Sequence, residues 1–458
     1  MYRFTYPSEE IIEDSISKKV IYDFILKHRS MISRIEKNKA YYKGHHAIEG
    51  RTRVSGAPNE RVICNHAKDI SDTASGYFMG NPITYDSTTD VDINPLLLAF
   101  DKAQVDDTDS DLALDLSICG LAYEYLYIKK DSKEIASKTL DPSCCFMVVD
   151  DTIEENEVFG VYYWKQKDDK NNRYIYKATI MTRHFVYEIT ISGTRKEPQY
   201  EESEKKEHYF GDIPLIEYLN NKYGIGDFEQ QIPLIDAYNT LMSDRINDKE
   251  QFIDALLVLY GSSLGDDEEE ANEAARVLRQ NKLLELPEGA KAEYLIRSMD
   301  ENGVEILRKA IKEDIYTFSH VPNLTDENFS GNSSGVAMEF KLLGLEMVTK
   351  IKTRYYKVGL RKRIKLFCNY LGLKNIAIEA DSITASFART LPKNLLELSQ
   401  VITNLKGTIS TKSLVRLIPF VEDPDNEIKQ VKKEIKEKGR EELQSFANNI
   451  PEKEVNDG

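Results

Sequence analysis

The chain has 458 residues, and its 61 Lys and Arg against 77 Asp and Glu give a formal net charge of −16. This acidic balance argues against a protein that wraps tightly around nucleic acid or docks on an anionic membrane, because both depend on basic side chains. Hydrophobic residues make up 41% of the chain, which excludes wholesale disorder, and the length predicts roughly three domains.

We expect neither a membrane span nor an export signal. No stretch approaches the ~20 apolar residues that a span requires, and Met1–Ser15 carries four acidic residues where a signal peptide would be apolar. The five cysteines are irregularly spaced and fit neither a disulfide framework nor a zinc site. They indicate synthesis in a reducing, intracellular compartment.

The first half of the chain begins helical and then changes period. Apolar spacing predicts helices over residues 1–45, Arg61–Gly80 and Asp107–Gly120, with a loop over Gly44–Pro58. From Leu121 onwards, short β-branched and aromatic runs predict an antiparallel β region. Its predicted strands are Tyr123–Ile128, Cys145–Val149, Phe159–Trp164, Tyr174–Ile180 and His184–Ile191, and the charged segment Arg195–Lys206 is predicted to be an exposed loop.

The second half is mostly helical. A helix is predicted from about Pro233, followed by a compact insert. Within the insert we expect a strand at Leu256–Tyr260, a helix at Asp266–Gln280, and a hairpin of Leu283–Leu286 with Ala292–Ile296. A capping-box pattern at Ser298 and Glu301 opens a second helix. The remaining predictions are a polar loop at Val321–Ser334, a long helix at Gly335–Tyr370, helices at Leu395–Leu405 and Lys412–Leu417, and a charged helix from Asp423 to about Asn448.

No catalytic motif is complete. The run Asp107–Asp111 begins like a calcium loop, but Leu112 stands where glycine is required, so a negatively charged helix start is the simpler interpretation. Gly407–Ser413 lacks the second glycine of a phosphate loop. Gly224–Gly226 lacks the third glycine of a dinucleotide fingerprint and fits a turn that enters a helix.

Metal chemistry is not indicated either. His45, His46 and Glu49 can be drawn as ligands, but adjacent histidines in a loop seldom converge on one ion. Asp266–Glu270 fits the first turn of a helix, where acidic residues complement the helix dipole. We therefore predict no catalytic residue, no metal and no cofactor.

One basic segment stands out in the acidic chain. It contains no acidic residue, and it fits either a helix face that is solvated or paired with acidic neighbours, or a basic surface for another subunit or nucleic acid. Its basic residues are Lys350, Lys352, Arg354, Lys357, Arg361, Lys362, Arg363 and Lys365.

Two long helices that flank a compact insert would leave narrow apolar seams exposed in a single chain. Assembly into a ring, with each seam buried by a neighbour, would resolve this. At this point the chain resembles a known family, the portal proteins of tailed bacteriophages of the SPP1-like type. The resemblance extends from about Ile35 to Leu373 and is carried by the strings at Asn65–Tyr85, Pro214–Phe252 and Phe318–Glu346.

The resemblance implies a mostly helical α+β portal fold with wing, stem, clip and crown regions. By position these would be a wing at 1–226 with its β region at 121–191, stem helices at 227–255 and 298–320, a clip at 256–297, a tunnel loop at 321–334, a wing helix at 335–392, a crown at 393–450 and a disordered tail at 451–458.

The function implied by the resemblance is mechanical. Portal subunits form a ring, usually of twelve, at one capsid vertex of the virion, through which double-stranded DNA is packaged and ejected. The implied partners are the terminase large subunit, head-completion or adaptor proteins, and scaffolding and major capsid proteins, with no membrane. Assembly is expected in the host bacterial cytoplasm.

Two groups of residues are candidates for facing the DNA. The tunnel loop offers polar groups that would hold the strand weakly, at Asn323, Asp326, Asn328, Asn332 and Ser333. On the second stem helix Arg308, Lys309 and Lys312 either face the tunnel or pair with Glu313 or Asp314 of a neighbouring subunit. Two other classes stay open at this stage: an enzyme or motor subunit that acts on nucleic acid, and a scaffold or adaptor without a tunnel.

Overall fold

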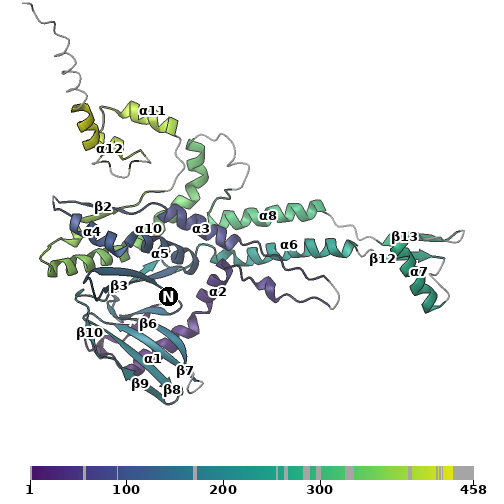
Figure 1. Ribbon diagram of the computed structural model, residues 1–458, viewed down its shortest axis with the longest axis horizontal. Helices are drawn as coiled ribbons and strands as arrows, with labels where there is room; N and C mark the ends of the chain where they lie inside the picture. The colour runs from purple at the N-terminus through teal and green to yellow at the C-terminus, as the bar shows by residue number, and fades with distance from the viewer. Residues whose placement is uncertain are drawn as a thin grey trace, which may run out of the picture. The chain divides into compact units, whose positions relative to one another are not determined.

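A computed structural model describes residues 3–54, 58–89, 91–168, 173–253, 256–261, 267–281, 289–295, 301–324, 335–389, 395–418, 421, 424 and 427–436 (Figure 1). The chain divides into two units, one of residues 1–323 and 342–390 and one of residues 324–341 and 391–458. The first unit holds the four sheets of the described chain.

The largest sheet has the strand order β1-β5-β6-β7-β8-β10, and β9 also pairs with β8. β1 and β5 run in parallel, and the other neighbours are antiparallel. Aromatic and β-branched residues favour this extended, half-buried arrangement. The strands are β1 (Phe4–Tyr6), β5 (Cys145–Asp150), β6 (Glu157–Asp168), β7 (Arg173–Met181), β8 (Phe185–Gly193), β9 (Pro198–Glu202) and β10 (Lys206–Glu207).

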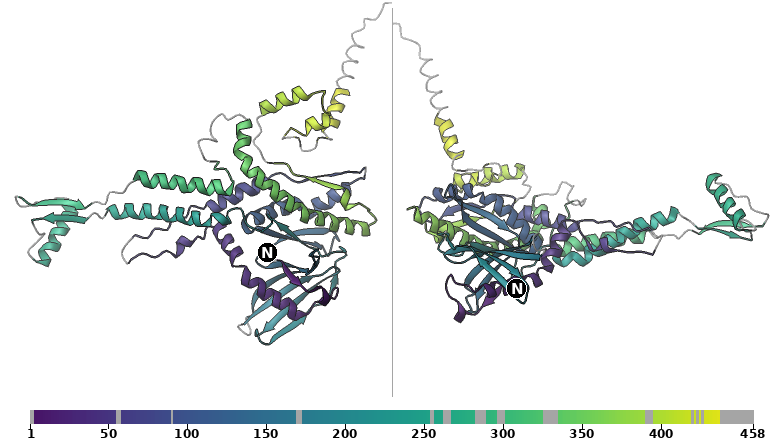
Figure 2. Two further views of the ribbon diagram at one scale, coloured as in Figure 1. Left: turned by 180° about the vertical axis from the view of Figure 1, so that it is seen from behind. Right: turned by 60° about the horizontal axis from the view of Figure 1, so that its bottom comes forward.

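Helix α1 (Lys18–Met31) covers one face of this sheet in both Figures 1 and 2. Its apolar stripe, which includes Ile21 and Ile25, shares a core with Phe146 and Phe159 of the strands. Because every third or fourth residue of α1 is apolar, a single face of the helix supplies this contact.

A second core lies around the three-stranded sheet β11-β3-β4. Its strands are β3 (Leu121–Ile128), β4 (Ile135–Leu140) and β11 (Leu215–Leu219). Buried residues of four helices complete this core: α3 (His66–Met79), α4 (Asn94–Ala103), α5 (Val105–Cys119) and α10 (Gly335–Leu373). Helix α2 (Ser33–Tyr42) packs against α5.

Helices α6 (Ile232–Ile253) and α8 (Glu301–Ser319) lie side by side (Figures 1 and 2). They are antiparallel, since Tyr238 meets Arg308 while Arg245 meets Glu301. Between them in sequence come β12 (Leu256–Tyr260), α7 (Glu268–Asn281) and β13 (Lys291–Leu295), and the two strands pair with each other.

The remaining elements are short. β2 (Thr84–Ser87) pairs with β14 (Ile383–Ser386), and 3-10 turns occupy Ser8–Glu10, Ala47–Gly50, Glu229–Gln231 and Ala380–Ser382. The second unit contains α11 (Leu395–Leu405), α12 (Thr411–Val415) and a helical stretch over residues 427–436.

The structure confirms the predicted strands between residues 121 and 191 and the helices that correspond to α3, α5, α6, α7, α8, α10 and α11. The prediction of a helix over the first residues is wrong, because Phe4 lies in β1, where its ring packs on Phe24 and Phe146. A loop over Arg195–Lys206 is also wrong, since β9 and β10 occupy it. Edge strands need only backbone pairing, so charged side chains are compatible with them.

The predicted insert and the predicted charged helix are only partly described by the structure. Ala292–Ile296 was expected to pair with Leu283–Leu286, and that pairing stays a prediction. β13 pairs with β12, a longer-range pairing around α7 that the sequence reasoning did not predict. Leu283–Leu286 and Ser298 lie outside the described residues, as do the ends of the predicted charged helix.

Candidate functional site

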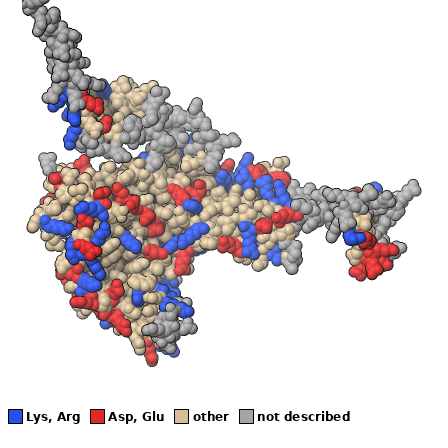
Figure 3. Space-filling model, in the orientation of Figure 1, with Lys and Arg blue, Asp and Glu red and all other residues tan. Residues whose placement is uncertain are grey.

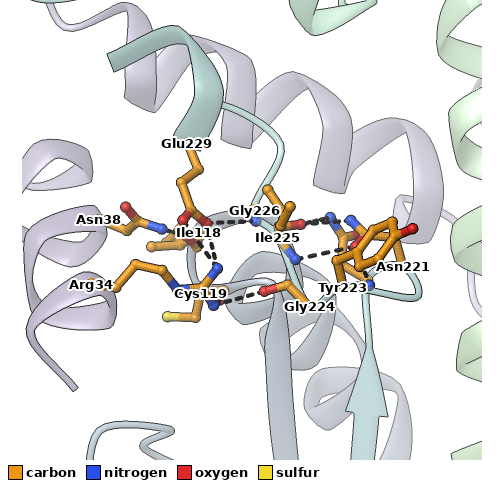
Figure 4. Close-up of polar contacts among 11 residues, drawn as sticks. Arg34, Asn38, Ile118, Cys119, Asn221, Tyr223, Gly224, Ile225, Gly226 and Glu229 are labelled. Carbon is orange, nitrogen blue, oxygen red and sulfur yellow. Dashed lines mark hydrogen bonds and ion pairs between the residues drawn. The ribbon is translucent and has the colours of Figure 1, made fainter. Parts of the chain in front are cut away.

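A tightly packed turn precedes α6 and determines where the paired helices begin (Figure 4). Gly120 ends α5 with φ +81°, and a Cβ on it would lie 2.1 Å from the carbonyl oxygen of Gly224. A Cβ on Gly226 would lie 2.6 Å from the carbonyl oxygen of Ile118. Side chains at either position would push the two backbones apart, so these glycines allow the close approach. The prediction of a turn entering a helix is confirmed.

Arg34 of α2 clamps this turn from outside (Figure 4). Its guanidinium donates to both carboxylate oxygens of Glu229 at 3.0 Å. It also donates to the carbonyl oxygens of Gly224 at 2.7 Å and Cys119 at 3.3 Å. Glu229 in turn accepts from the backbone N–H of Gly226 at 3.1 Å. One arginine thus joins α2, α5 and the start of α6.

Asp227 connects the same turn to α10. Its backbone N–H donates to the carbonyl of Ser117 at 2.8 Å, and its carboxylate binds the Lys352 ammonium at 2.6 Å. The side chains of Lys352 and Asp227 are only 2% and 6% exposed, so this ion pair lies in the interior. Asn221 closes the turn by accepting from the N–H groups of Tyr223 and Ile225.

A ladder of polar side chains on α6 binds the extended segment that precedes α3. Asn239, Ser243 and Asn247 are fully buried at four-residue spacing, so they share one face of α6. They accept the backbone N–H groups of Cys64, Val62 and Glu60 at 2.9, 2.9 and 2.6 Å. Sequence reasoning missed this ladder, although polar residues every fourth position in an apolar helix are its signal.

Ion pairs and an aromatic cluster join α6 to α8. Arg245 donates to Glu301 at 3.1 Å and Glu305 at 2.9 Å, and Arg308 donates to Glu305 and to the Tyr238 hydroxyl. Hydrogen bonds from Arg308 and Arg245 lower the pKa of Glu305 to about 2. Arg308 is therefore engaged within its own chain.

His66 joins α3 to both helices. Its ring packs edge-on against Tyr238 and Tyr316, and the Tyr316 hydroxyl donates to Asp69 at 2.6 Å. Burial lowers the pKa of His66 to about 4, so the ring is neutral at physiological pH.

The basic segment of α10 divides into an internal and an external part. Arg363 is fully buried, where it donates to Glu124 at 2.8 Å and pairs with Asp109 at 2.6 Å. Burial raises the pKa of Asp109 to about 6. Arg363 and Lys352 therefore fit the interpretation in which this segment pairs with acidic neighbours, and they do not belong to a basic surface, because both compensate buried carboxylates.

Four other basic residues of this segment also have partners within the chain. Lys362 pairs with Glu157 and donates to the carbonyl of Leu215, and Lys365 pairs with Asp212 at 2.9 Å. Lys350 approaches Glu346 at 3.7 Å, and Lys357 lies over the Phe387 ring. Arg354 and Arg361 are exposed and make no such contact with any described residue.

These two arginines lie on an exposed apolar stripe of α10. Steps of three and four residues place Leu343, Met347, Ile351 and Val358 on the same face, and these side chains are 46–60% exposed. A second exposed face lies on α8, with Ile306, Leu307 and Phe318 at 70%, 50% and 61%. Glu313 and Asp314 are exposed on the same helix. Exposed apolar side chains that gather on one face of a helix are typical of interaction sites.

The predicted loop residues are mostly beyond what the structure describes. Asn323 follows α8, whereas Asp326, Asn328, Asn332 and Ser333 lie outside the described residues. Lys309 is exposed on α8, and Lys312 lies over the Tyr316 ring. Their roles toward DNA or a neighbour stay predictions.

The rejected motifs have structural explanations. Asp107–Asp111 lies within α5, and Asp267 caps the first turn of α7 by accepting from the Glu270 N–H at 2.9 Å. His46 is buried, stacks on Tyr41 and bonds to Asn239. Among the described residues no group of three or more His, Cys, Asp or Glu side chains is placed to hold a metal. No helix in the same part of the chain is long and apolar enough to cross a membrane.

The exposed apolar faces of α8 and α10 are typical of a subunit that packs against other chains. The family model described as phage portal protein, SPP1 Gp6-like, matches residues 22–441. The chain therefore belongs to that family, and the predicted family, the α+β fold and the portal function are confirmed.

Individual relatives are distant. The portal protein of Clostridium phage phiCD119 is 21% identical over 386 residues, which cover 80% of this chain and 82% of that protein. The portal protein of Bacillus phage SPP1 is 22% identical over 396 residues, covering 82% and 76%.

Similar solved structures include a chain from the neck of an empty GTA particle computed with C6 symmetry. It has a TM-score of 0.47 and 11% identity, covering 77% of this chain and 89% of that one. A chain from the neck of a native GTA particle computed with C12 symmetry has a TM-score of 0.46 and 12% identity, covering 78% and 89%.

Proposed function

We propose that this chain forms a closed ring of about twelve subunits at one capsid vertex, and that double-stranded DNA passes through the ring during packaging and ejection. Membership of the portal family supports this, as does the presence of two different unpartnered faces in one subunit. A ring requires such a pair of faces, because each subunit must offer one surface to the neighbour on its left and another to the neighbour on its right.

The observation that carries the assembly is the complementarity of these two faces. The α10 stripe, defined by Leu343, Met347, Ile351 and Val358, carries Arg354 and Arg361, two cations that have no ion-pair partner among the described residues. The α8 face, defined by Ile306, Leu307 and Phe318, carries the acidic Glu313 and Asp314. Apolar burial would supply affinity, and opposite charges would set the register between neighbouring subunits.

The regional assignment is part of the same proposal. The antiparallel pair α6 and α8 fits a stem, and the β12-α7-β13 insert between them fits a clip. The first three residues of α7 are glutamates, and Figure 3 shows acidic side chains gathered on this helix. The two sheets and α10 would form the wing, residues 321–334 the tunnel loop and residues 393–450 the crown.

DNA would be held weakly in this ring. A formal charge of −16 per subunit opposes tight phosphate binding, because stable contacts come from Lys and Arg that displace counterions. Most basic residues of α10 and Arg308 are neutralised within the chain, which leaves few cations to retard a moving duplex. Lys309, Lys312 and Asn323 remain the described candidates for contact.

In this proposal the ring is a passive conduit without enzymatic activity, assembled in the host cytoplasm. A terminase large subunit and later a head-completion protein would dock on the clip, while scaffolding and major capsid proteins would surround the wing. The acidic first turn of α7 would favour a basic surface on the docking partner.

Negative-stain images and mass photometry of the purified chain test the proposal. We expect rings with a central hole. A protein that stays monomeric at every concentration and that hydrolyses ATP or cuts DNA would instead support the nucleic-acid enzyme, whereas a compact oligomer without a hole would support an adaptor.

A further inference from the structure

A pocket in the first unit combines an apolar floor with a basic rim. It lies between α4, the start of β4 and the end of α10, and has a volume of about 250 Å³. Leu98, Ala99, Ile135, Leu371 and Ile376 supply apolar lining. Ligand pockets for small molecules usually measure about 300–1,000 Å³, so this one suits a single large apolar side chain better than a cofactor.

The wall of the pocket is held in place by the turn between β3 and β4. The carbonyl of Lys133 accepts from the Tyr370 hydroxyl at 2.8 Å and from the Lys374 ammonium at 3.0 Å. Backbone hydrogen bonds from Lys129 to Glu134 and from Lys133 to Lys129 close the turn itself. The pocket is therefore preformed, which lowers the entropy cost of filling it.

The rim is basic in an acidic protein. Lys102 of α4 pairs with Glu134 across the mouth at 2.7 Å, and Lys374 lies over the Tyr370 ring. Glu134 has a lowered pKa because Lys102 donates to it and Lys129 and Lys374 are close. Three lysines, Lys102, Lys129 and Lys374, therefore lie close to the single carboxylate of the pocket lining, Glu134.

Leu98 is 60% exposed at the pocket, although the core does not need an apolar residue at so exposed a position. An apolar anchor site surrounded by cations is complementary to an acidic segment with one large apolar residue.

We propose that this pocket docks an acidic peptide segment of another protein, with one leucine-sized side chain in the pocket and its carboxylates over the lysine rim. Nucleic acid would satisfy the lysines but leave the apolar lining unfilled, which makes it the poorer fit. The inference is independent of DNA passage, since it concerns a surface that the proposed ring contact and tunnel do not use.

Fluorescence anisotropy on the full-length protein tests this with a labelled acidic peptide that carries one central leucine. We expect saturable binding that weakens in high salt and that falls about tenfold or more when alanine replaces the leucine in the peptide. Leu98→Glu should reduce binding to a similar extent, because it adds an anion at the pocket. Ile153→Glu is the matched control, since Ile153 is fully exposed elsewhere, and it should leave binding unchanged.

Three outcomes would overturn the proposal. The first is the absence of saturable binding, and the second is equal binding of the leucine and alanine peptides. The third is that a DNA duplex displaces the peptide and that the Lys374→Glu variant binds this duplex less tightly than the unaltered protein does. The peptide comparison uses the unaltered protein, so it decides the question even where a variant fails to fold.

Discussion

Lys352 and Asp227 form a buried ion pair at 2.6 Å. The pair joins the middle of α10 to the turn that precedes α6. The Lys352 ammonium also lies 5.7 Å from the centre of the Phe78 ring on α3. Three segments far apart in sequence thus meet at one charged contact. The contact joins α10 and α3 to the turn that precedes α6.

Removing one partner of this pair should be strongly destabilising. Lys352→Met leaves the Asp227 carboxylate buried without a counter-ion, so we expect a loss of about 3–5 kcal/mol in the free energy of unfolding. The double variant Lys352→Met with Asp227→Asn should recover part of that loss. Urea unfolding at fixed protein concentration measures it, with the exposed Arg195→Met as control. Equal stability of the single and double variants would show that the two charges are not coupled.

The polar ladder of α6 predicts that substitutions along this helix lower the free energy of unfolding by amounts that depend on whether the residue belongs to the ladder. Asn239→Ala removes the acceptor for the Cys64 N–H, and leaving a buried donor unpaired should cost about 1–3 kcal/mol. Thr240→Ala, one residue further on the exposed side, should change stability by less than about 0.5 kcal/mol. Hydrogen exchange at Val62 and Cys64 should accelerate only in the ladder variant; unchanged exchange would contradict the ladder's role.

The two complementary faces predict a charge-reversal pattern in assembly. Arg354→Glu combined with Arg361→Glu should raise the concentration needed for ring formation about tenfold or more, because like charges would then meet across the contact. Adding Glu313→Arg and Asp314→Arg to the same chain should restore assembly. Mass photometry across a dilution series reports the result. Arg195→Glu, on an exposed turn, serves as control. If the chain with all four substitutions still fails to assemble, the α8 and α10 faces do not contact each other in the ring.

Asp115 on α5 predicts a pH-dependent stability. Burial, together with the charges of Asp141 and Asp111, raises the pKa of Asp115 to about 7, although Lys39 opposes the shift. Between pH 3.8 and about 7 the folded state therefore holds a proton that the unfolded state has released, so this group's contribution to stability falls as the pH rises through that window.

Asp115→Asn abolishes the titration. The variant should be more stable than the parent near pH 8 by on the order of 1 kcal/mol, and the advantage should vanish near pH 4. Thermal unfolding across this range measures the difference. Asp111→Asn, exposed on the same helix, should show much less of it. An advantage for Asp115→Asn that is equal at both pH values would point to packing rather than to charge.

Much of the architecture could be read from local pattern. Apolar residues recur at helical spacing in α3 and α10, and β-branched runs mark β5 to β8. These patterns are visible in the sequence because the side-chain repeat of a helix or strand is a local property. The acidic start of α7 and the turn before α6 were also predictable, since capping and glycine turns depend on neighbouring residues.

Other features depended on distant partners. β9 is charged and β1 has three residues, so each becomes a strand only because another strand supplies its hydrogen bonds. β13 follows a predicted turn, yet it pairs with β12 on the far side of α7. Pairing between strands is a long-range choice that no local window contains.

By itself, the sequence determined most of the helices, the central strands of the largest sheet, the acidic balance and, through its resemblance, the family. Only the tertiary structure decided the fate of each cation on α10, where Lys352 and Arg363 are buried beside carboxylates and Arg354 and Arg361 are exposed. Helical periodicity puts Lys352 and Arg363 on one face of α10 and Arg354 and Arg361 on the opposite face. It does not say that the face with Lys352 and Arg363 is buried, because burying these charges depends on carboxylates more than a hundred residues away.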